Sequence, residues 1–233
     1  MRTDCVRQVS TSNARLRLRA KCSLGGERVE KQQWLTWAQE IQSIGQAGVE
    51  YSPDVFDRER FKRLRSLAAE IISQYADISI EKATDLFAGE NGYQTPKVDV
   101  RAVVPQDGRI LLVKENDNKW ALPGGWAEPN LSLRENVAKE VMEEAGVTIE
   151  PQAVIAILDR NRHTDDNYPY SVYKIFVRCT YLGGQFEHNI ETSDAKFFSR
   201  TEIPELSITR TTMNQLLLCF DRLLDNNIET LFE

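Results

Sequence analysis

Three glutamates, Glu140, Glu143 and Glu144, lie close together in a segment that the sequence predicts to be helical. Positions i, i+3 and i+4 share one face of an α-helix, so the three carboxylates would project side by side. Like charges at this spacing repel one another, and a bound cation would remove the repulsion. Carboxylate oxygens favour hard cations such as Mg²⁺, Mn²⁺ or Ca²⁺. The spacing therefore indicates a hard-metal site, and a phosphate group is the natural partner of such a metal.

An ordinary solvated helix face is the alternative for these glutamates, because charged residues are common on exposed helix surfaces. Two features favour the metal site. Val137, Val141 and Ala145 form an apolar stripe, so one side of the helix would be packed. The Pro-Gly-Gly turn at residues 123–125 precedes the helix, and glycines let the backbone approach a ligand closely.

The residues that flank this helix predict where it begins and ends. Ser132 and Glu135 have the spacing of a capping box, in which each side chain bonds the backbone N–H of the other residue. Gly146 stands where a left-handed glycine commonly ends a helix.

Together these residues resemble the Nudix box, whose pattern is G-x5-E-x7-R-E-U-x-E-E-x-G-U. The matching residues are Gly125, Lys139-Glu140-Val141, Glu143-Glu144 and Gly146-Val147. Two positions depart from the pattern, since the family's first Glu falls on Leu131 and its Arg falls on Lys139. In the family these two residues are commonly an ion pair that braces the loop against the helix. The departures therefore concern loop bracing more than metal binding.

The resemblance implies an α/β fold, the Nudix α/β/α sandwich with a mixed sheet. It also implies a Mg²⁺ cofactor, with Mn²⁺ as an alternative, held by Glu140, Glu143, Glu144 and the backbone carbonyl of Gly125. The same three glutamates are the predicted catalytic residues. Such a metal would neutralise the charge of a bound pyrophosphate and acidify a water molecule.

The general base is placed variously in the family, either on this helix or on a distant loop. Glu187 and Glu191 follow the last long predicted strand and are the candidates for that loop, with Glu191 taken as the catalytic candidate. For each of the two, an ordinary surface glutamate is the favoured alternative.

Several residues near the glycine turn are candidates for substrate binding. Trp120 and Trp126 flank the turn and could stack on a nucleobase or pack in the core. Arg101 and Lys114 lie on predicted strands that should border the pocket, and each could bind phosphate or be a strand-edge charge. The predicted substrate-binding set is Arg101, Lys114, Trp120, Gly124, Gly125 and Trp126.

Three segments are predicted along the chain. Residues 1–30 are basic and are expected to form a disordered tail, with an organelle transit peptide as the alternative. Residues 31–90 have helical periodicity and should form a small all-helical domain, in which Gly45 and Gly48 are expected to break the first helix. Residues 96–233 contain the predicted strands and the closing helix, and should form the Nudix domain.

The helical segment resembles the extension that precedes the catalytic domain in a subset of Nudix hydrolases. This resemblance implies a pyrophosphatase that acts on CDP-choline, ADP-ribose or a related nucleotide, and it implies a homodimer. The reaction would cleave a nucleoside diphosphate linked to another moiety into a nucleoside monophosphate and a phosphorylated product. A nucleotide-sensing module of the same fold and an RNA-end-processing enzyme are the alternatives.

Composition excludes some classes of protein. The 233-residue chain has a net charge of −6 and no basic run with interleaved aromatics, so nucleic-acid binding is not expected. No apolar run approaches the length needed to span a bilayer, and no membrane partner is expected. The four cysteines are scattered and form no metal-type pair, which predicts reduced thiols and a cytoplasmic setting.

Overall fold

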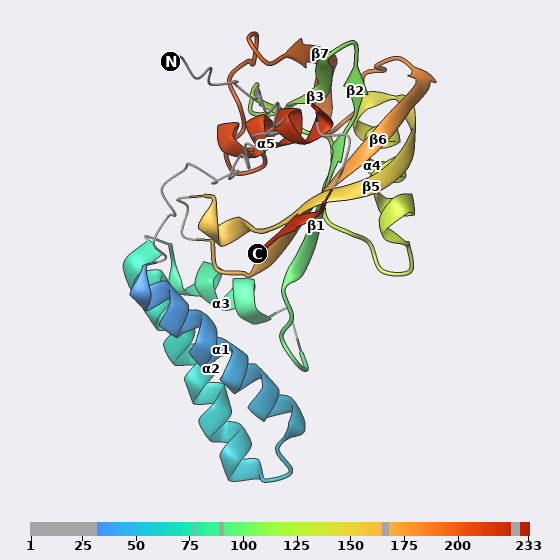
Figure 1. Ribbon diagram of the computed structural model, residues 1–233. Coiled ribbons are helices and arrows are strands. Elements are labelled where there is room, and N and C mark those ends of the chain that lie inside the picture. Colours follow the sequence, from blue (N-terminus) through green and yellow to red (C-terminus); the bar gives the residue numbers. More distant parts are fainter. Residues whose placement is uncertain (1–31, 77, 89–90, 165–167, 225–228) are drawn as a thin grey trace, which may run out of the picture.

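A computed structural model describes residues 32–76, 78–88, 91–164, 168–224 and 229–233 (Figure 1). The predicted basic tail at residues 1–30 lies outside the described residues. In the described part, a helical unit is followed by an α/β domain in which helices cover both faces of the strands. The predicted fold class, an α/β/α sandwich preceded by a small helical domain, is confirmed.

The helical unit is a helical hairpin with a short third helix. Its elements are α1 (Gln33–Tyr51), α2 (Val55–Ala76) and α3 (Ile80–Ala88). Leu35 and Ala38 of α1 are buried with Ala68, Ala69 and Ile72 of α2, so small side chains allow the two long helices to pack closely. None of the helices in the described ranges is both long and apolar enough to cross a bilayer.

The expectation that Gly45 and Gly48 break the first helix is wrong, because α1 continues through both residues to Tyr51. A Cβ atom at Gly48 would lie 2.2 Å from the ring of Phe61 in α2. A Cβ atom at Gly45 would lie 2.8 Å from the Cγ of Arg65. These glycines therefore permit close helix contact rather than end the helix, and packing outweighs their low helix propensity.

The α/β domain contains two four-stranded sheets. Its strands are β1 (Lys97–Val103), β2 (Pro105–Gln106), β3 (Arg109–Glu115), β4 (Trp120–Ala121), β5 (Val147–Asp159), β6 (Val172–Gly184), β7 (Thr192–Ser199) and β8 (Leu231–Phe232). The first sheet has the order β1-β6-β5-β8 and is mixed, because β1 pairs with β6 in parallel and β5 pairs with β6 antiparallel. The second sheet is antiparallel, with β3 pairing to β2, β4 and β7.

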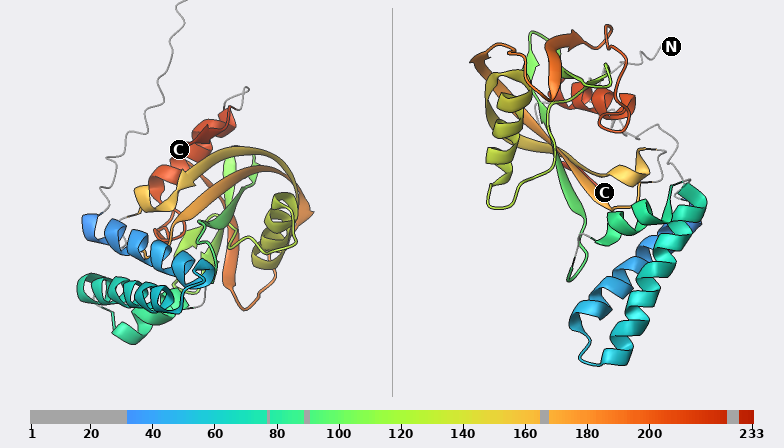
Figure 2. Two further views of the ribbon diagram at one scale, coloured as in Figure 1. Left: turned by 90° about the horizontal axis from the view of Figure 1, so that it is seen from below. Right: turned by 180° about the vertical axis from the view of Figure 1, so that it is seen from behind.

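The two faces of the strands are covered by different helices, α4 (Leu133–Ala145) and α5 (Met213–Leu224) (Figure 2). Along β3, Leu111 and Val113 pack in the cluster of α4, whereas Ile110 and Leu112 pack in the cluster of α5. This alternation follows from the two-residue period of a strand, and it gives the domain two separate cores. The sandwich holds α4 firmly on one side, which fixes the direction of its carboxylates.

Candidate active site

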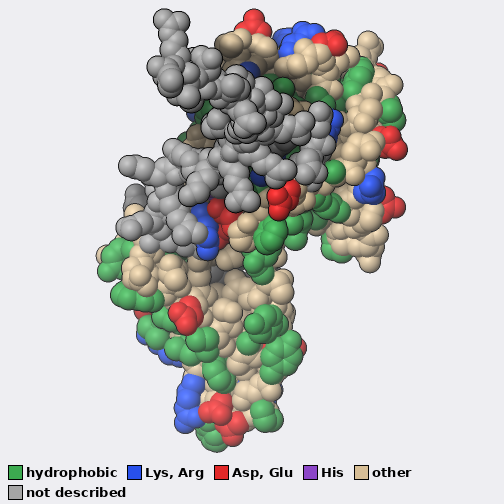
Figure 3. Space-filling view, in the orientation of Figure 1, with side chains coloured by type: hydrophobic (Ala, Val, Ile, Leu, Met, Phe, Trp, Pro, Cys, Tyr) green, Lys and Arg blue, Asp and Glu red, His purple; other side chains and the backbone are tan. Residues whose placement is uncertain are grey.

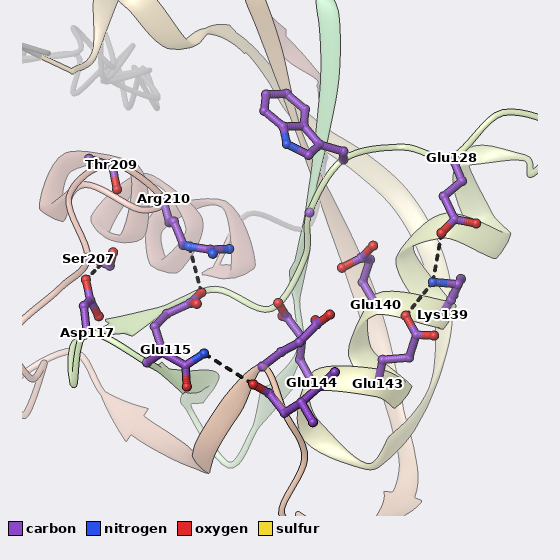
Figure 4. Close-up of a pocket in the computed structure, with 15 residues that line it drawn as sticks. Glu115, Asp117, Glu128, Lys139, Glu140, Glu143, Glu144, Ser207, Thr209 and Arg210 are labelled. Carbon is purple, nitrogen blue, oxygen red and sulfur yellow. Dashed lines mark hydrogen bonds and ion pairs between the residues drawn. The ribbon is translucent and has the colours of Figure 1, made fainter. Parts of the chain in front are cut away.

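A cleft of about 640 Å³ lies where α4, the glycine turn, the end of β3 and the loop before α5 meet (Figure 4). Its lining contains seven carboxylates and two cationic side chains. The lining residues are Glu115, Asn116, Asp117, Gly125, Trp126, Glu128, Lys139, Glu140, Glu143, Glu144, Ile190, Glu191, Ser207, Thr209 and Arg210.

One side of the cleft is the α4 face that bears Glu140, Glu143 and Glu144, here called the helix wall. The predicted caps of α4 are confirmed, since Ser132 and Glu135 form a capping box and Gly146 ends the helix at φ 65°. With these ends fixed, the buried apolar stripe of α4 faces the core and the three glutamates face the cleft.

The glycine turn contacts the helix wall directly. The N–H of Gly124 donates a hydrogen bond to Oε2 of Glu144 at 2.8 Å. Gly124 has a φ of 139°, and a Cβ atom there would lie 2.0 Å from the carbonyl oxygen of Val100, so only glycine fits. A Cβ atom at Gly125 would lie 2.8 Å from Oε2 of Glu140. The missing side chain at Gly125 therefore leaves room for that carboxylate.

Burial changes the charge state of the carboxyl groups in the cleft. Glu144 is only 3% exposed, and burial raises its pKa to about 8, although nearby Arg101 and the Gly124 N–H act in the opposite direction. Burial also raises the pKa of Glu140 and of Glu115 above the ordinary value. Burial in the cleft makes the ionised form of these carboxyl groups unfavourable. A bound cation would stabilise the ionised form and would therefore be favourable there.

The loop between the glycine turn and α4 is braced in spite of the departures from the family pattern. Lys139 forms ion pairs with Glu128 of the loop, at 3.2 Å, and with Glu143 of the helix. The buried amide of Asn136 also holds the loop, because it accepts from the N–H of Glu128 and donates to the carbonyl oxygen of Leu131. Lys139 therefore holds the loop through Glu128 and not through residue 131. The hydrogen bonds of Asn136 attach the loop to the helix at a second point.

The other side of the cleft, here called the opposite wall, consists of Glu115, Asp117, Ser207, Thr209 and Arg210. Nε of Arg210 lies 3.2 Å from Oε1 of Glu115 and forms an ion pair with it. Oε1 of Glu115 is nevertheless buried without a hydrogen-bond donor. Ser207 donates to Oδ2 of Asp117 at 3.2 Å. This wall offers a guanidinium, hydroxyls and carboxylates to a ligand.

A buried group of charges supports both walls. Arg101 forms an ion pair with Asp99 at 2.8 Å and donates to the carbonyl oxygen of Leu122 at 3.1 Å, just before the glycine turn. Lys174 is fully buried; its Nζ lies 3.8 Å from Oδ2 of Asp99 and donates to the carbonyl oxygen of Arg210. These charges therefore tie the glycine turn and the Arg210 loop to the mixed sheet.

The loop that carries Glu191 is tied to the end of α4. Asn189 and Thr192 both donate to the backbone carbonyl oxygen of Glu144, at 3.3 Å and 2.5 Å respectively. This contact places Glu191 at the cleft. Glu187, the other candidate for a loop base, lines a separate hollow of about 310 Å³ instead.

The structure thus brings together some of the predicted site residues and not others. Glu140, Glu143, Glu144, Glu191, Gly125 and Trp126 all line the cleft, and Gly124 reaches Glu144 through its amide. Arg101, Lys114 and Trp120 do not line the cleft. Arg101 is buried in the ion pair with Asp99, and Trp120 packs edge-on against Phe198 in the core.

The residues of the opposite wall are absent from the predicted set. Glu115 and Asp117 follow a buried strand, and Ser207, Thr209 and Arg210 lie about ninety residues later in a short loop. Nothing local in the sequence joins these two segments. The one feature of the sequence that could have indicated them is their position after a strand or in a loop, because binding and catalytic residues are commonly found there.

The donor set fits a hard divalent cation. It contains only oxygen atoms, Gly125 leaves space beside Glu140, and Oε1 of Glu115 accepts no hydrogen bond although Arg210 is ion-paired with it. No three acidic, His or Cys side chains in the described residues already converge on one point. Glu143 is held by Lys139, and Glu144 is held by the Gly124 amide. Metal binding would therefore require rotation of these side chains.

The chain is similar to known proteins over most of its length. Residues 94–217 match the model of the NUDIX domain, and residues 32–87 match the model described as the UDP-X-like, N-terminal oligomerisation domain. The chain is 46% identical over 201 residues to YjhB of Bacillus subtilis (strain 168), whose name gives ADP-ribose pyrophosphatase as a provisional activity. That match covers 86% of this chain and 97% of YjhB.

Two solved structures are similar as well. An ADP-ribose pyrophosphatase from Streptococcus suis 89-1591 is 44% identical, with a TM-score of 0.56, over 60% of this chain and all of that one. A UDP-X diphosphatase is 32% identical, with a TM-score of 0.57, over 86% of this chain and 98% of that one. The chain therefore belongs to the Nudix hydrolase family. It is a Nudix pyrophosphatase with an N-terminal helical domain, as its sequence predicts.

Proposed function

We propose that this protein hydrolyses the pyrophosphate of ADP-ribose in a reaction that depends on Mg²⁺ or Mn²⁺. One water molecule is consumed, the P–O–P bond breaks, and AMP and ribose 5-phosphate form. The observation that carries the proposal is the cleft, whose lining contains seven carboxylates and only two cationic side chains. Such a cleft would repel an anionic diphosphate unless divalent cations were bound in it.

In this proposal Glu140, Glu143 and Glu144 hold the cation, with the carbonyl of Gly125 as a further ligand. The Gly125 carbonyl accepts from the N–H of Val100 at 2.8 Å and keeps a second lone pair for this purpose. When bound, the cation neutralises phosphate charge, orients the pyrophosphate and acidifies a water molecule. Glu191 is the candidate that removes the proton from the attacking water, because it lines the cleft on its own loop.

The opposite wall and Trp126 bind the rest of the substrate in this proposal. Arg210 suits a phosphate oxygen, since a guanidinium forms two parallel hydrogen bonds with such a group. Asp117 and Ser207 suit the hydroxyl groups of a ribose. Trp126 is 48% exposed at the cleft, which leaves its ring surface free to stack on adenine.

ADP-ribose is preferred over other nucleotides because of the two relatives with the higher identity, 46% and 44%, whose names give that activity. A UDP-linked substrate is the second candidate, since the UDP-X diphosphatase match and the description of the N-terminal model both point to it. No comparison favours CDP-choline specifically.

A substrate panel tests this proposal. ADP-ribose, UDP-glucose and CDP-choline would each be incubated with the protein and Mg²⁺ or Mn²⁺, and the phosphate that alkaline phosphatase frees from the products would be measured. The expected result is the highest kcat/KM for ADP-ribose. A higher value for UDP-glucose or CDP-choline would overturn the substrate, and no hydrolysis of any member with either metal would overturn the reaction.

We also infer that the chain is a homodimer that forms through its N-terminal helical domain. Support comes from the match of residues 32–87 to a domain whose description is oligomerisation. A helical unit of this size also has a small core, so contact with another subunit would stabilise it. Light scattering on the purified protein measures the assembly, and a monomeric mass would contradict the inference.

A further inference from the structure

Lys174 of β6 is a charged residue in the interior of the α/β domain. On the face of the molecule drawn in Figure 3, Lys and Arg side chains (blue) reach the surface over both the helical unit and the α/β domain. Lys174, in contrast, is 0% exposed. Removal of an ammonium group from water is costly, and an apolar side chain of similar volume is often as good for stability. Stability alone therefore does not account for a charge at this position.

The register of the mixed sheet places Lys174 beside the ion pair of Asp99 and Arg101. The strands β1 and β6 are parallel neighbours, and Asp99 stands opposite Lys174. Arg101 follows two residues later on β1, so it points to the same face of the sheet as Asp99. Further along this face, Val103 and Phe176 pack in the core of α5. The three charged side chains therefore continue the face of the sheet that α5 covers.

Lys174 holds the Arg210 loop, residues 207–211, by its backbone. Its Nζ donates to the carbonyl oxygen of Arg210 and lies 3.5 Å from that of Thr209. The loop is a tight turn, because the N–H of Arg210 donates to the carbonyl oxygen of Ser207 at 2.9 Å. With the backbone held in this way, the guanidinium of Arg210 reaches the cleft, where its Nε lies 3.2 Å from Oε1 of Glu115.

The same group of charges reaches the glycine turn through Leu122, and the contacts close into a ring. Arg101 donates to the carbonyl oxygen of Leu122 at 3.1 Å. The N–H of Leu122 donates to Oγ1 of Thr211, in the Arg210 loop, also at 3.1 Å. Asp99 completes the ring, because its Oδ1 accepts from Arg101 at 2.8 Å and its Oδ2 lies 3.8 Å from Nζ of Lys174. All five residues are buried, so water is kept from these contacts.

We propose that Lys174 is a positioning residue that fixes the Arg210 loop relative to the glycine turn, and that it thereby determines how tightly the diphosphate of the substrate is bound. The proposal rests on the proposed function, in which Arg210 contacts a phosphate oxygen. Lys174 does not line the cleft and acts through the backbone of the loop. A guanidinium that binds a phosphate oxygen through two hydrogen bonds depends on placement within a fraction of an ångström, which a held backbone provides.

Lys174→Met tests this role, because it removes the charge and keeps most of the volume. The variant should raise KM by about 5-fold or more and change kcat by less than about 2-fold, since the Arg210 loop loses its donor. The melting temperature should change little, because a buried charge is replaced by an apolar side chain. In an Arg210→Ala background the same substitution should leave KM unchanged, because Lys174 acts through that side chain. An unchanged KM in the single variant, or a further rise in the double variant, would overturn the proposal.

Phe176→Leu is the matched control for a loss of packing. Phe176 is fully buried two residues after Lys174 on the same strand and packs in the core of α5. The control should lower the melting temperature more than Lys174→Met does, because it leaves a cavity, and it should not change KM. If Phe176→Leu raised KM as much as Lys174→Met, the effect of Lys174 would be one of general packing and the proposal would fail.

Thr211→Val and Thr211→Ser test the contact between the loop and the glycine turn. Valine keeps the shape of threonine but cannot accept from the N–H of Leu122, whereas serine can. Thr211→Val should raise KM by about 5-fold, because the buried N–H of Leu122 loses its acceptor and the ring opens. Thr211→Ser should keep the KM of the wild type. Equal KM values for the two variants would contradict the ring as the connection between the two walls.

Hydrogen exchange followed by mass spectrometry tests the same role without any substrate. In Lys174→Met, peptides that cover residues 205–212 should exchange their amide hydrogens about 10-fold faster than in the wild type, because the loop opens more often. Peptides that cover α4 should exchange at the wild-type rate. Unchanged exchange in the loop would overturn the positioning role, whatever the activity of the variant.

The outcomes separate this role from the proposed function. A wild-type protein that hydrolyses no member of the substrate panel would overturn the proposed function, and the exchange measurement would then still decide whether Lys174 fixes the loop. An active wild type whose Lys174→Met variant has the same KM and the same loop exchange would overturn the role of Lys174 and leave the proposed function standing.

Discussion

The two walls of the cleft are built from different kinds of sequence information. The helix wall comes from three glutamates within five residues of one capped helix. The opposite wall joins the end of β3 to a loop roughly ninety residues later. The first wall follows from helix geometry, whereas the second exists only after the sheets have formed.

This difference suggests a division of labour between the walls. The helix wall has carboxylates and no cation except Lys139, which is already engaged with Glu128 and Glu143. The opposite wall adds Arg210 and hydroxyl groups. We therefore expect the helix wall to determine turnover through metal binding and the opposite wall to determine substrate affinity. The predictions below test this division, starting with the largest effect.

Glu144→Gln should lower turnover by about 100-fold or more, because the variant removes a buried charged ligand that stabilises the transition state. The fold should survive, since a glutamine oxygen can still accept from the Gly124 N–H. Turnover of wild type and variant with Mg²⁺ would be compared under saturating substrate. Glu187→Gln, outside the cleft, is the control. Unchanged turnover in Glu144→Gln would remove the helix wall from the mechanism.

Gly125→Ala should lower turnover by about 10-fold while the melting temperature changes little. The new Cβ would lie 2.8 Å from Oε2 of Glu140, at the end of a flexible side chain that can move away. Movement of one ligand by an ångström is enough to impair a catalytic arrangement. In a Glu140→Gln background the same substitution should have no further effect, because both changes disturb one carboxylate. Additive losses would contradict that explanation.

Arg210→Ala should raise KM by about 10-fold or more with a smaller change in kcat, since charge-assisted hydrogen bonds contribute roughly 1.5–3 kcal/mol. Steady-state kinetics with the best substrate of the panel would measure both constants. Arg200→Ala is the control, because Arg200 is paired with Asp221 away from the cleft. A loss confined to kcat would break the proposed division between the two walls.

Lys139→Met should have the smallest effect, a few-fold at most in turnover and a small change in melting temperature. Partly exposed ion pairs contribute about 0–1 kcal/mol, and Asn136 continues to hold the loop. Replacing Asn136 with Ala should cost more stability, because its amide is buried among backbone groups. The opposite ranking in thermal unfolding would show that the ion pair is the main brace.

Much of the fold was predictable because local patterns agree with it. The caps of α4, the apolar stripe at Val137 and Val141, and the alternation of apolar residues along β1 are each local to one element. The predicted end of the first helix at Gly45 and Gly48 was wrong. The low helix propensity of glycine indicates a helix end, whereas the close contact of Gly48 with Phe61 depends on tertiary packing that the local sequence does not show.

The candidate site was predictable only on its helical side. Arg101 was predicted at the pocket because a cation on a strand suits a phosphate, yet Asp99 two residues earlier pairs with it below the cleft. Lys174 gave no signal at all, because Asp99 and the backbone carbonyl of Arg210, which it contacts, are both distant from it in sequence. Long-range contacts of this kind leave no periodic pattern in the sequence.

The most direct measurement is the position of the metal in a crystal of the protein grown with Mn²⁺ and a non-hydrolysable methylene analogue of ADP-ribose. Anomalous scattering should place manganese against the carboxylates of Glu140 and Glu144, with the analogue's two phosphorus groups between it and Arg210. Manganese elsewhere, or an analogue bound with no metal beside α4, would contradict the account.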